Sequence, residues 1–278
     1  MTQHAAVFLS QSVVQFEFPA ASDEALPGVR WGAVDAFPTP AYWAYQVLAR
    51  RVSGQAIQYR LGQSLAEEVA ACLLGGHGMP AEMGVAAFGR LRAAGLLEGT
   101  PDEDCLYQEL AKPMEINGRS CRYRFAKQKA RYLASALASL AQGEPPTGSG
   151  RLLRDWLMEL PGIGPKTASW VSRNWLDADD VAILDIHILR AGAVAGFFER
   201  GLTVERDYLK LEQQFLQFSH AIGVRASELD AVIWLEMMAS PAATRKRMRA
   251  GESRRSGTAL RTGSHKRRSD PNQAALID

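Results

Sequence analysis

The stretch Leu160-Pro161-Gly162-Ile163-Gly164-Pro165-Lys166-Thr167-Ala168 lies between two segments with helical periodicity. Glycines at 162 and 164 permit the backbone conformations of a tight hairpin, and Pro165 suits the first turn of a following helix. Such a hairpin points backbone N–H groups and a helix N-terminus outward, which together bind a phosphate without reading a base. The stretch therefore predicts a nucleic-acid backbone contact at Gly162, Ile163 and Gly164, and the alternative is an ordinary Gly/Pro-rich turn.

The rest of the central sequence is also helical in pattern. Ser64 and Glu67 form a capping box at the start of a helix, and Gly143–Gly150 reads as a linker-like break. Apolar residues at helical spacing mark two long closing helices, around Leu211–Ile222 and Leu229–Met237. The helices expected before these lie at about 65–74, 81–94, 102–111, 124–141, 152–159, 165–176 and 186–195. A mainly α-helical fold follows.

The two ends of the chain differ from this helical part. Residues 1–62 contain four prolines, a strand-like stretch at Val13–Phe18 and a short helix candidate near Tyr42–Arg51. Residues 241–278 carry ten Lys or Arg against three Asp or Glu, with few bulky apolar side chains, so a disordered basic tail is expected. We therefore expect a short irregular, β-containing N-terminal segment (1–62) packing on a helical domain (63–240).

Composition limits the class of protein. The chain is 47% hydrophobic and 22% charged, and it lacks the apolar run of roughly 18 residues that a membrane span needs. Its first residues do not resemble a secretory signal, so a cytoplasmic location is expected. Cys72, Cys105 and Cys121 stand too far apart to suggest a disulfide framework or a metal cluster. No metal and no cofactor are expected.

A second motif, Val181-Ala182-Ile183-Leu184-Asp185-Ile186-His187-Ile188-Leu189-Arg190, follows the hairpin, with Asp185 19 residues after Lys166. With both motifs the chain resembles the helix-hairpin-helix (HhH-GPD) DNA glycosylase superfamily, in which LPGIG-x-K-x-A opens the helix that bears a catalytic lysine. The Asp-x-His is similar to the 8-oxoguanine glycosylase branch. The resemblance implies a two-lobed helical fold, with Lys166 in a cleft between the lobes and Asp185 as its carboxylate partner.

The lysine and the aspartate suit cleavage of an N-glycosidic bond. A lysine amine is nucleophilic only when it is neutral, and desolvation or a helix N-terminus favours that form. Lys166 could attack C1′ of the deoxyribose and form a Schiff base, while Asp185 stabilises the cationic sugar or assists proton transfer. The alternatives are that Lys166 only contacts a phosphate and that Asp185 only caps the helix after it.

Further residues are candidates for contacts with DNA. We expect His187 and Arg190 to contact phosphates near the site, although an isolated histidine is often structural. Lys127 and Lys129 lie in Tyr123-Arg124-Phe125-Ala126-Lys127-Gln128-Lys129-Ala130, which resembles a family segment that starts a helix near the DNA. Both lysines could meet phosphates, and a solvated basic helix start is the competing interpretation.

A base within a duplex must be extruded into a pocket before a nucleophile can reach its sugar. Trp170 and Asn174 lie four and eight residues after Lys166, on the same side of the helix. The segment around Trp234 resembles the last helix of smaller 8-oxoguanine glycosylases, in which an aromatic residue stacks on the extruded base. Phe125 could enter the gap that the base leaves in the duplex. We assign these four residues to the base pocket, and burial in the core is the alternative for both tryptophans.

Together these features predict a DNA glycosylase with an associated AP-lyase step that removes an oxidised purine, 8-oxoguanine first. Its expected partner is double-stranded DNA with a damaged or modified base, bound by a monomer. The sequence lacks the four clustered cysteines that hold an iron–sulfur cluster in other members of the superfamily. Two alternatives remain: a bacterial defence protein acting on a modified base or nucleotide, and a DNA-binding protein without catalysis.

Overall fold

The computed structural model describes residues 1–55, 60–76 and 78–239, which belong to one compact unit. In this part of the chain the helices are α1 (Pro40–Val52), α2 (Leu65–Leu74), α3 (Ala81–Ala93), α4 (Glu103–Ala111), α5 (Ala126–Gln142), α6 (Gly150–Met158), α7 (Pro165–Leu176), α8 (Ile186–Ala195), α9 (Val204–Ala221) and α10 (Ala226–Ala239). The predicted mainly α-helical fold is confirmed. The predicted tail, 241–278, lies outside the described residues.

Short polar residues begin several helices where the sequence predicts a start. The Ser64 hydroxyl accepts a hydrogen bond from the Glu67 N–H at 3.2 Å, as the predicted capping box requires. Thr39, Asp102 and Ser149 cap α1, α4 and α6 in the same way. Because a cap satisfies N–H groups that the helix itself leaves open, these residues fix where the helices begin.

Within the described residues, three small antiparallel hairpins accompany the helices. They pair β1 (Gln3–Phe8) with β2 (Val13–Phe18), β3 (Glu24–Leu26) with β4 (Val29–Arg30), and β5 (Met114–Ile116) with β6 (Arg119–Cys121). The strand predicted at Val13–Phe18 is confirmed. The β5–β6 hairpin was not predicted, although its turn is Asn117-Gly118, both with positive φ, which is a common hairpin signal.

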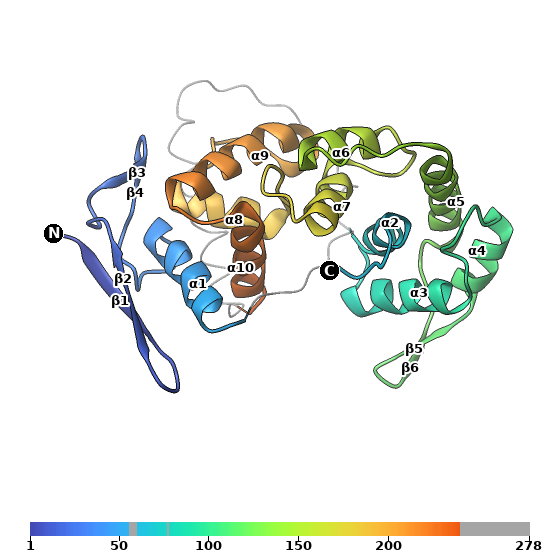
Figure 1. Ribbon diagram of the computed structural model, residues 1–278, viewed down its shortest axis with the longest axis horizontal. Coiled ribbons are helices and arrows are strands. Elements are labelled where there is room, and N and C mark those ends of the chain that lie inside the picture. Colours follow the sequence, from blue (N-terminus) through green and yellow to red (C-terminus); the bar gives the residue numbers. More distant parts are fainter. Residues whose placement is uncertain (56–59, 77, 240–278) are drawn as a thin grey trace, which may run out of the picture. The chain divides into compact units, whose positions relative to one another are not determined.

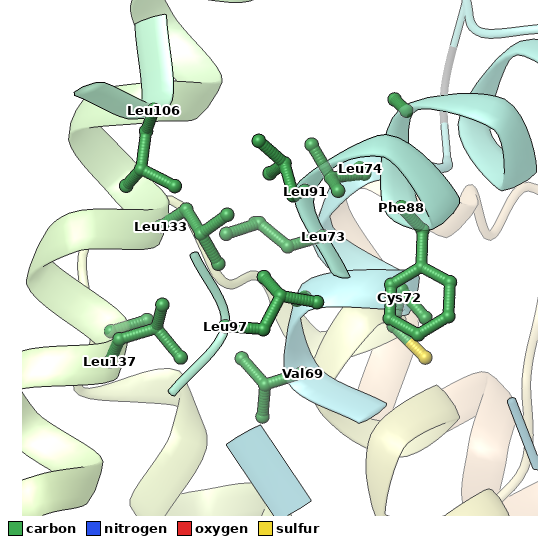
Figure 2. Packing of buried hydrophobic residues seen from close by; sticks show 14 of the residues in the cluster. Val69, Cys72, Leu73, Leu74, Phe88, Leu91, Leu97, Leu106, Leu133 and Leu137 are labelled. Carbon is green, nitrogen blue, oxygen red and sulfur yellow. The ribbon is translucent and has the colours of Figure 1, made fainter. Parts of the chain in front are cut away.

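The core of one group of helices lies around α2. Figure 2 shows apolar side chains of α2 together with residues of α3 and α5, and all of them are buried. Figure 1 shows α2 beside both α3 and α7, in agreement with the contacts between these helices. The labelled residues of this cluster are Val69, Cys72, Leu73, Leu74, Phe88, Leu91, Leu97, Leu106, Leu133 and Leu137. Leu160 and Ile163, between α6 and α7, belong to the same cluster, so this segment is packed onto the core of the α2 group.

A second group of helices packs around α10, which contacts α1, α8 and α9. The N-terminal segment is joined to it through side chains: Tyr42 and Arg50 of α1 both bind the carboxylate of Glu236 in α10. The aromatic rings of Phe16 and Tyr45 also meet edge to face between β2 and α1. Among the described residues, no helix has the length and apolar character to cross a membrane.

Candidate active site

The predicted hairpin connects α6 to α7. Gly162 has a φ of +81°, a conformation that favours glycine, and the Ile163 N–H donates to the Leu160 carbonyl at 3.2 Å. Ile163 is buried, whereas Gly162 and Gly164 are exposed, and Gly164 is the residue that precedes α7. The Ile163 side chain therefore anchors the hairpin, and the two glycines remain exposed.

Lys166 lies in the first turn of α7 and faces Asp185. Its Nζ lies 3.9 Å from Oδ2 of Asp185, and the Lys166 side chain is about one-third exposed. The other oxygen of Asp185, Oδ1, accepts hydrogen bonds from the N–H groups of His187 and Ile188 at 2.8 and 3.1 Å. Asp185 therefore caps α8 with one oxygen and turns the other towards the lysine, so the two interpretations of this residue are compatible.

The backbone before Asp185 is held by buried side chains. The Ala182 N–H donates to Glu212, and the Leu184 N–H donates to the Tyr208 hydroxyl, both of α9. The Ile183 N–H donates to Asp230 of α10 at 3.1 Å. Three successive N–H groups thus bind three different side chains, which fixes an otherwise irregular segment.

A pocket of about 330 Å³ contains Lys166 and Asp185. Its α7 wall consists of Lys166, Trp170 and Arg173, which share one face of the helix because they are four and three residues apart. The other lining residues are Leu61, Ile183, Asp230, Ala231, Trp234 and Leu235. A second hollow, of about 500 Å³ and lined by residues such as His220 and Glu228, contains neither Lys166 nor Asp185.

The structure separates the four residues assigned to the base pocket. Trp170 and Trp234 line the pocket, and Trp234 is 40% exposed. Asn174 is buried and is not a lining residue, since its amide donates to the Glu68 carboxylate at 2.6 Å. Phe125 is also not a lining residue and lies just before α5. Asn174 therefore has a structural partner in place of the base contact that the sequence analysis assigned to it.

The residues assigned to phosphate contacts lie on two helices. His187 and Arg190 are half-buried on α8, while Lys127 is exposed on α5. Lys129 is half-buried, and desolvation lowers the pKa of its amine, an effect that Tyr132 partly opposes. Contacts of these four residues with DNA stay predictions.

Two charged residues of the pocket, Arg173 and Asp230, were not predicted from the sequence. The pKa of the Asp230 carboxyl is raised from 3.8 to about 6, mainly by burial and in smaller part by the charge of Asp185, while Arg173 opposes the rise. Two weak signals were present in the sequence. Arg173 lies two helical turns after Lys166, and Asp230 lies one turn before Trp234.

The chain is similar in sequence to known proteins of one enzyme family. The sequence profile of the 8-oxoguanine DNA glycosylase family matches residues 55–224. The 8-oxoguanine DNA glycosylase/AP lyases of Saccharolobus islandicus and Methanocaldococcus jannaschii are each 31% identical to the chain over 126 residues. These matches cover 42% and 44% of the chain, respectively, and span 60% of the length of each curated relative.

Solved structures show the same fold. The crystal structure of the Methanocaldococcus jannaschii 8-oxoguanine DNA glycosylase matches with a TM-score of 0.55 and 23% identity, covering 72% of this chain and 93% of that one. An endonuclease III–DNA complex matches with a TM-score of 0.54 and 18% identity, covering 79% and 99%. On the profile match and the shared fold, the chain belongs to the 8-oxoguanine DNA glycosylase branch of the helix-hairpin-helix glycosylase family.

Proposed function

We propose that the chain is a DNA glycosylase with an associated AP-lyase step that excises an oxidised purine, most directly 8-oxoguanine, from double-stranded DNA. The observation that carries the proposal is the 3.9 Å approach of Lys166 Nζ to Asp185 Oδ2 inside a pocket. A lysine amine in a pocket with a carboxylate beside it, able to take up its proton, fits covalent catalysis with an adjacent base. The curated relatives named above support the same activity.

In the proposed reaction, Nζ of Lys166 forms a bond to C1′ while the N-glycosidic bond breaks. The electron pair of that bond leaves with the base nitrogen, which takes up a proton. Oδ2 of Asp185 faces the region where positive charge develops on the sugar, and it can also accept a proton from the attacking amine. The C1′–O4′ bond then breaks, O4′ takes its electron pair and a proton, and a Schiff base forms between C1′ and Nζ. Loss of a C2′ proton next expels the 3′ phosphate with the electron pair of its C–O bond.

The pocket suits an extruded purine because two indole side chains line it. Trp170 comes from α7 and Trp234 from α10, so a flat base can lie against an aromatic surface next to the lysine. Gly162 and Gly164 of the hairpin are exposed, and their backbone N–H groups are proposed to bind a phosphate of the DNA. Lys127, His187 and Arg190 are further proposed phosphate contacts.

Borohydride trapping tests the proposal, because reduction turns a Schiff base into a stable covalent adduct. The substrates are duplexes that carry 8-oxoguanine, an abasic site or no lesion, and the proteins are wild type, Lys166→Gln and Asp185→Asn. Lys210→Gln, which removes an exposed lysine on α9, is the matched control. We expect adducts with the first two duplexes for wild type and control, none for Lys166→Gln, and fewer by about 100-fold for Asp185→Asn.

Two other outcomes would change the proposal. If wild type forms an adduct with abasic DNA but not with 8-oxoguanine, the lyase step stands and the substrate assignment is wrong. If wild type binds both lesion duplexes yet yields neither adduct nor free base, the chain is a DNA-binding protein without this chemistry. Affinity measured on the same duplexes separates this second outcome from misfolding.

A further inference from the structure

We propose that Asp230, paired with Arg173, is a positioning residue that fixes the segment bearing Asp185 against the helix bearing Lys166. The inference rests on the proposed function. It adds a residue that keeps Lys166 Nζ and Asp185 Oδ2 at their distance of 3.9 Å. Its basis is the set of contacts that these two buried side chains make with three separate parts of the fold.

The first contact joins Asp230 to the segment before α8. Oδ2 of Asp230 accepts a hydrogen bond from the Ile183 N–H at 3.1 Å, two residues before Asp185. An accepting carboxylate from α10 thus holds the backbone that carries Asp185. Because Asp185 also caps α8, a shift at Ile183 would move both the cap and the oxygen that faces Lys166.

The second contact joins Asp230 to the helix of the lysine. Oδ1 of Asp230 lies 3.6 Å from an Arg173 guanidinium nitrogen, and the two side chains are only 3% and 6% exposed. Arg173 is seven residues after Lys166, on the same face of α7. The same Arg173 nitrogen also donates to the Ser227 carbonyl at 3.5 Å, so it ties α7 to the first turn of α10.

This pair is therefore the point where α7, α10 and the Asp185 segment meet. Removing one partner of a buried ion pair leaves the other charge uncompensated, which makes the arrangement sensitive to either residue. A displacement of about 1 Å between reacting groups can lower a rate by about 100-fold. The Lys166–Asp185 distance thus depends on two residues that stand outside the bond-making step.

Asp230 also borders the pocket, so contact with the bound base is the competing role. The two roles differ on abasic DNA, which has no base to contact but still needs Lys166 and Asp185 in place. The experiment compares single-turnover trapping by full-length wild type and Asp230→Asn on abasic and on 8-oxoguanine duplexes, at saturating protein. Leu137→Ala, which opens a cavity in the core of the α2 group, controls for lost stability.

A positioning role predicts that Asp230→Asn lowers the rate by 10- to 100-fold on both duplexes, with DNA affinity within about threefold of wild type. The Leu137→Ala protein should form the covalent adduct with DNA at the wild-type rate, at a temperature where this variant is folded. If Asp230→Asn lowers the rate only on the 8-oxoguanine duplex, Asp230 contacts the base and the inference is overturned. A wild-type rate on both duplexes would also overturn it. Absence of an adduct with wild type would instead refute the proposed function itself.

Arg173→Lys provides a second variant in case Asp230→Asn does not fold. Lysine keeps the positive charge but lacks the planar group that reaches both Asp230 and the Ser227 carbonyl. The inference predicts a parallel loss on both duplexes for this variant too. A wild-type rate on abasic DNA would overturn it.

The pH profile supplies a measurement that lost stability alone would not change. The groups around Asp230 are Arg173 of α7, Tyr208 of α9, and Asp179 and Asp185 of the segment before α8. Since the pKa of Asp230 is raised to about 6, acidification through that value removes its charge and weakens its hold on Arg173. The wild-type rate on abasic DNA should therefore fall on acidification through about pH 6, and Asp230→Asn should lack this step.

Discussion

Gly162 of the hairpin lies directly against the ring of Tyr132 in α5. A Cβ atom added to Gly162 would stand 2.2 Å from Cδ2 of that ring, and its φ is +81°. Gly164, two residues later, has a φ of −91°, and a Cβ atom there would meet nothing within 4 Å. The two glycines of one motif therefore have different requirements: the first must be glycine, whereas the second has room for a side chain.

Gly162→Ala is predicted to lower the free energy of unfolding by about 2 kcal/mol or more. The left-handed conformation alone costs a non-glycine residue roughly 1–2 kcal/mol, and the Tyr132 ring must also move. Gly164→Ala should cost less than about 1 kcal/mol, since alanine is only a poorer residue before a helix. Urea unfolding of both variants measures the difference, and equal losses would contradict it.

Trp234→Ala is predicted to lower the rate on 8-oxoguanine DNA by 10-fold or more while leaving the rate on abasic DNA near that of wild type. Trp234 is 40% exposed and lines the pocket, so its loss removes an aromatic surface for the base and little packing. Single-turnover trapping on the two duplexes gives both rates, and Trp234→Phe should recover most of the loss.

Met238→Ala is the matched control, because Met238 is 49% exposed one turn further along α10 and does not line the pocket. Its rates on both duplexes should equal those of wild type. If Trp234→Ala slowed both reactions equally, the indole would support the fold of the site rather than the bound base.

The hairpin could be predicted from the sequence because its signals are local, whereas the pairing of Lys166 with Asp185 came from the family resemblance. Glycines at fixed spacing and Pro165 before Lys166 define a turn and a helix start, and Asp185 before an apolar helix is a good cap. The structure brings Lys166 and Asp185 to 3.9 Å. Trp170 was also placed correctly in the pocket, because four residues correspond to about one helical turn.

The rest of the site depends on tertiary packing that a single sequence does not encode locally. Asn174, eight residues after Lys166, has turned far enough around α7 to meet Glu68 of α2 instead of the pocket. Arg173 and Asp230 are 57 residues apart, and nothing near either one indicates the other. Buried charged residues are rare, so a sequence-based interpretation places both at the surface by default.

Protonation of Asp230 is predicted to make stability depend on pH between about 4 and 6. The folded state raises the pKa of this buried carboxyl from 3.8 to about 6, so it binds the proton more tightly than the unfolded chain. Its favourable contribution is complete below the unfolded pKa and is lost as pH rises through about 6. Each pKa unit corresponds to about 1.4 kcal/mol, so the free energy of unfolding loses about 3 kcal/mol in total as the pH rises.

Urea unfolding of wild type and Asp230→Asn across this pH range measures the effect. The difference in unfolding free energy should shift in favour of wild type by about 2.5 kcal/mol on going from pH 7 to pH 4, and the rest of the effect appears below pH 4. All other titrating groups are common to the two proteins and largely cancel in the difference. Parallel curves would show that Asp230 titrates at its ordinary pKa.

Lys127→Ala is predicted to weaken binding to undamaged and 8-oxoguanine duplexes equally and to reduce the salt dependence of binding. Lys127 is exposed at the start of α5, and the sequence has no Asp or Glu between Glu115 and Glu144 that could neutralise it within that stretch. Loss of one phosphate contact should lower the slope of log affinity against log salt by about 0.9. Lys210→Ala is the control because Lys210 already pairs with Glu199 at 2.6 Å.

Fluorescence anisotropy at several salt concentrations gives the slope for each protein. Equal slopes for Lys127→Ala and wild type would place Lys127 outside the DNA-binding surface.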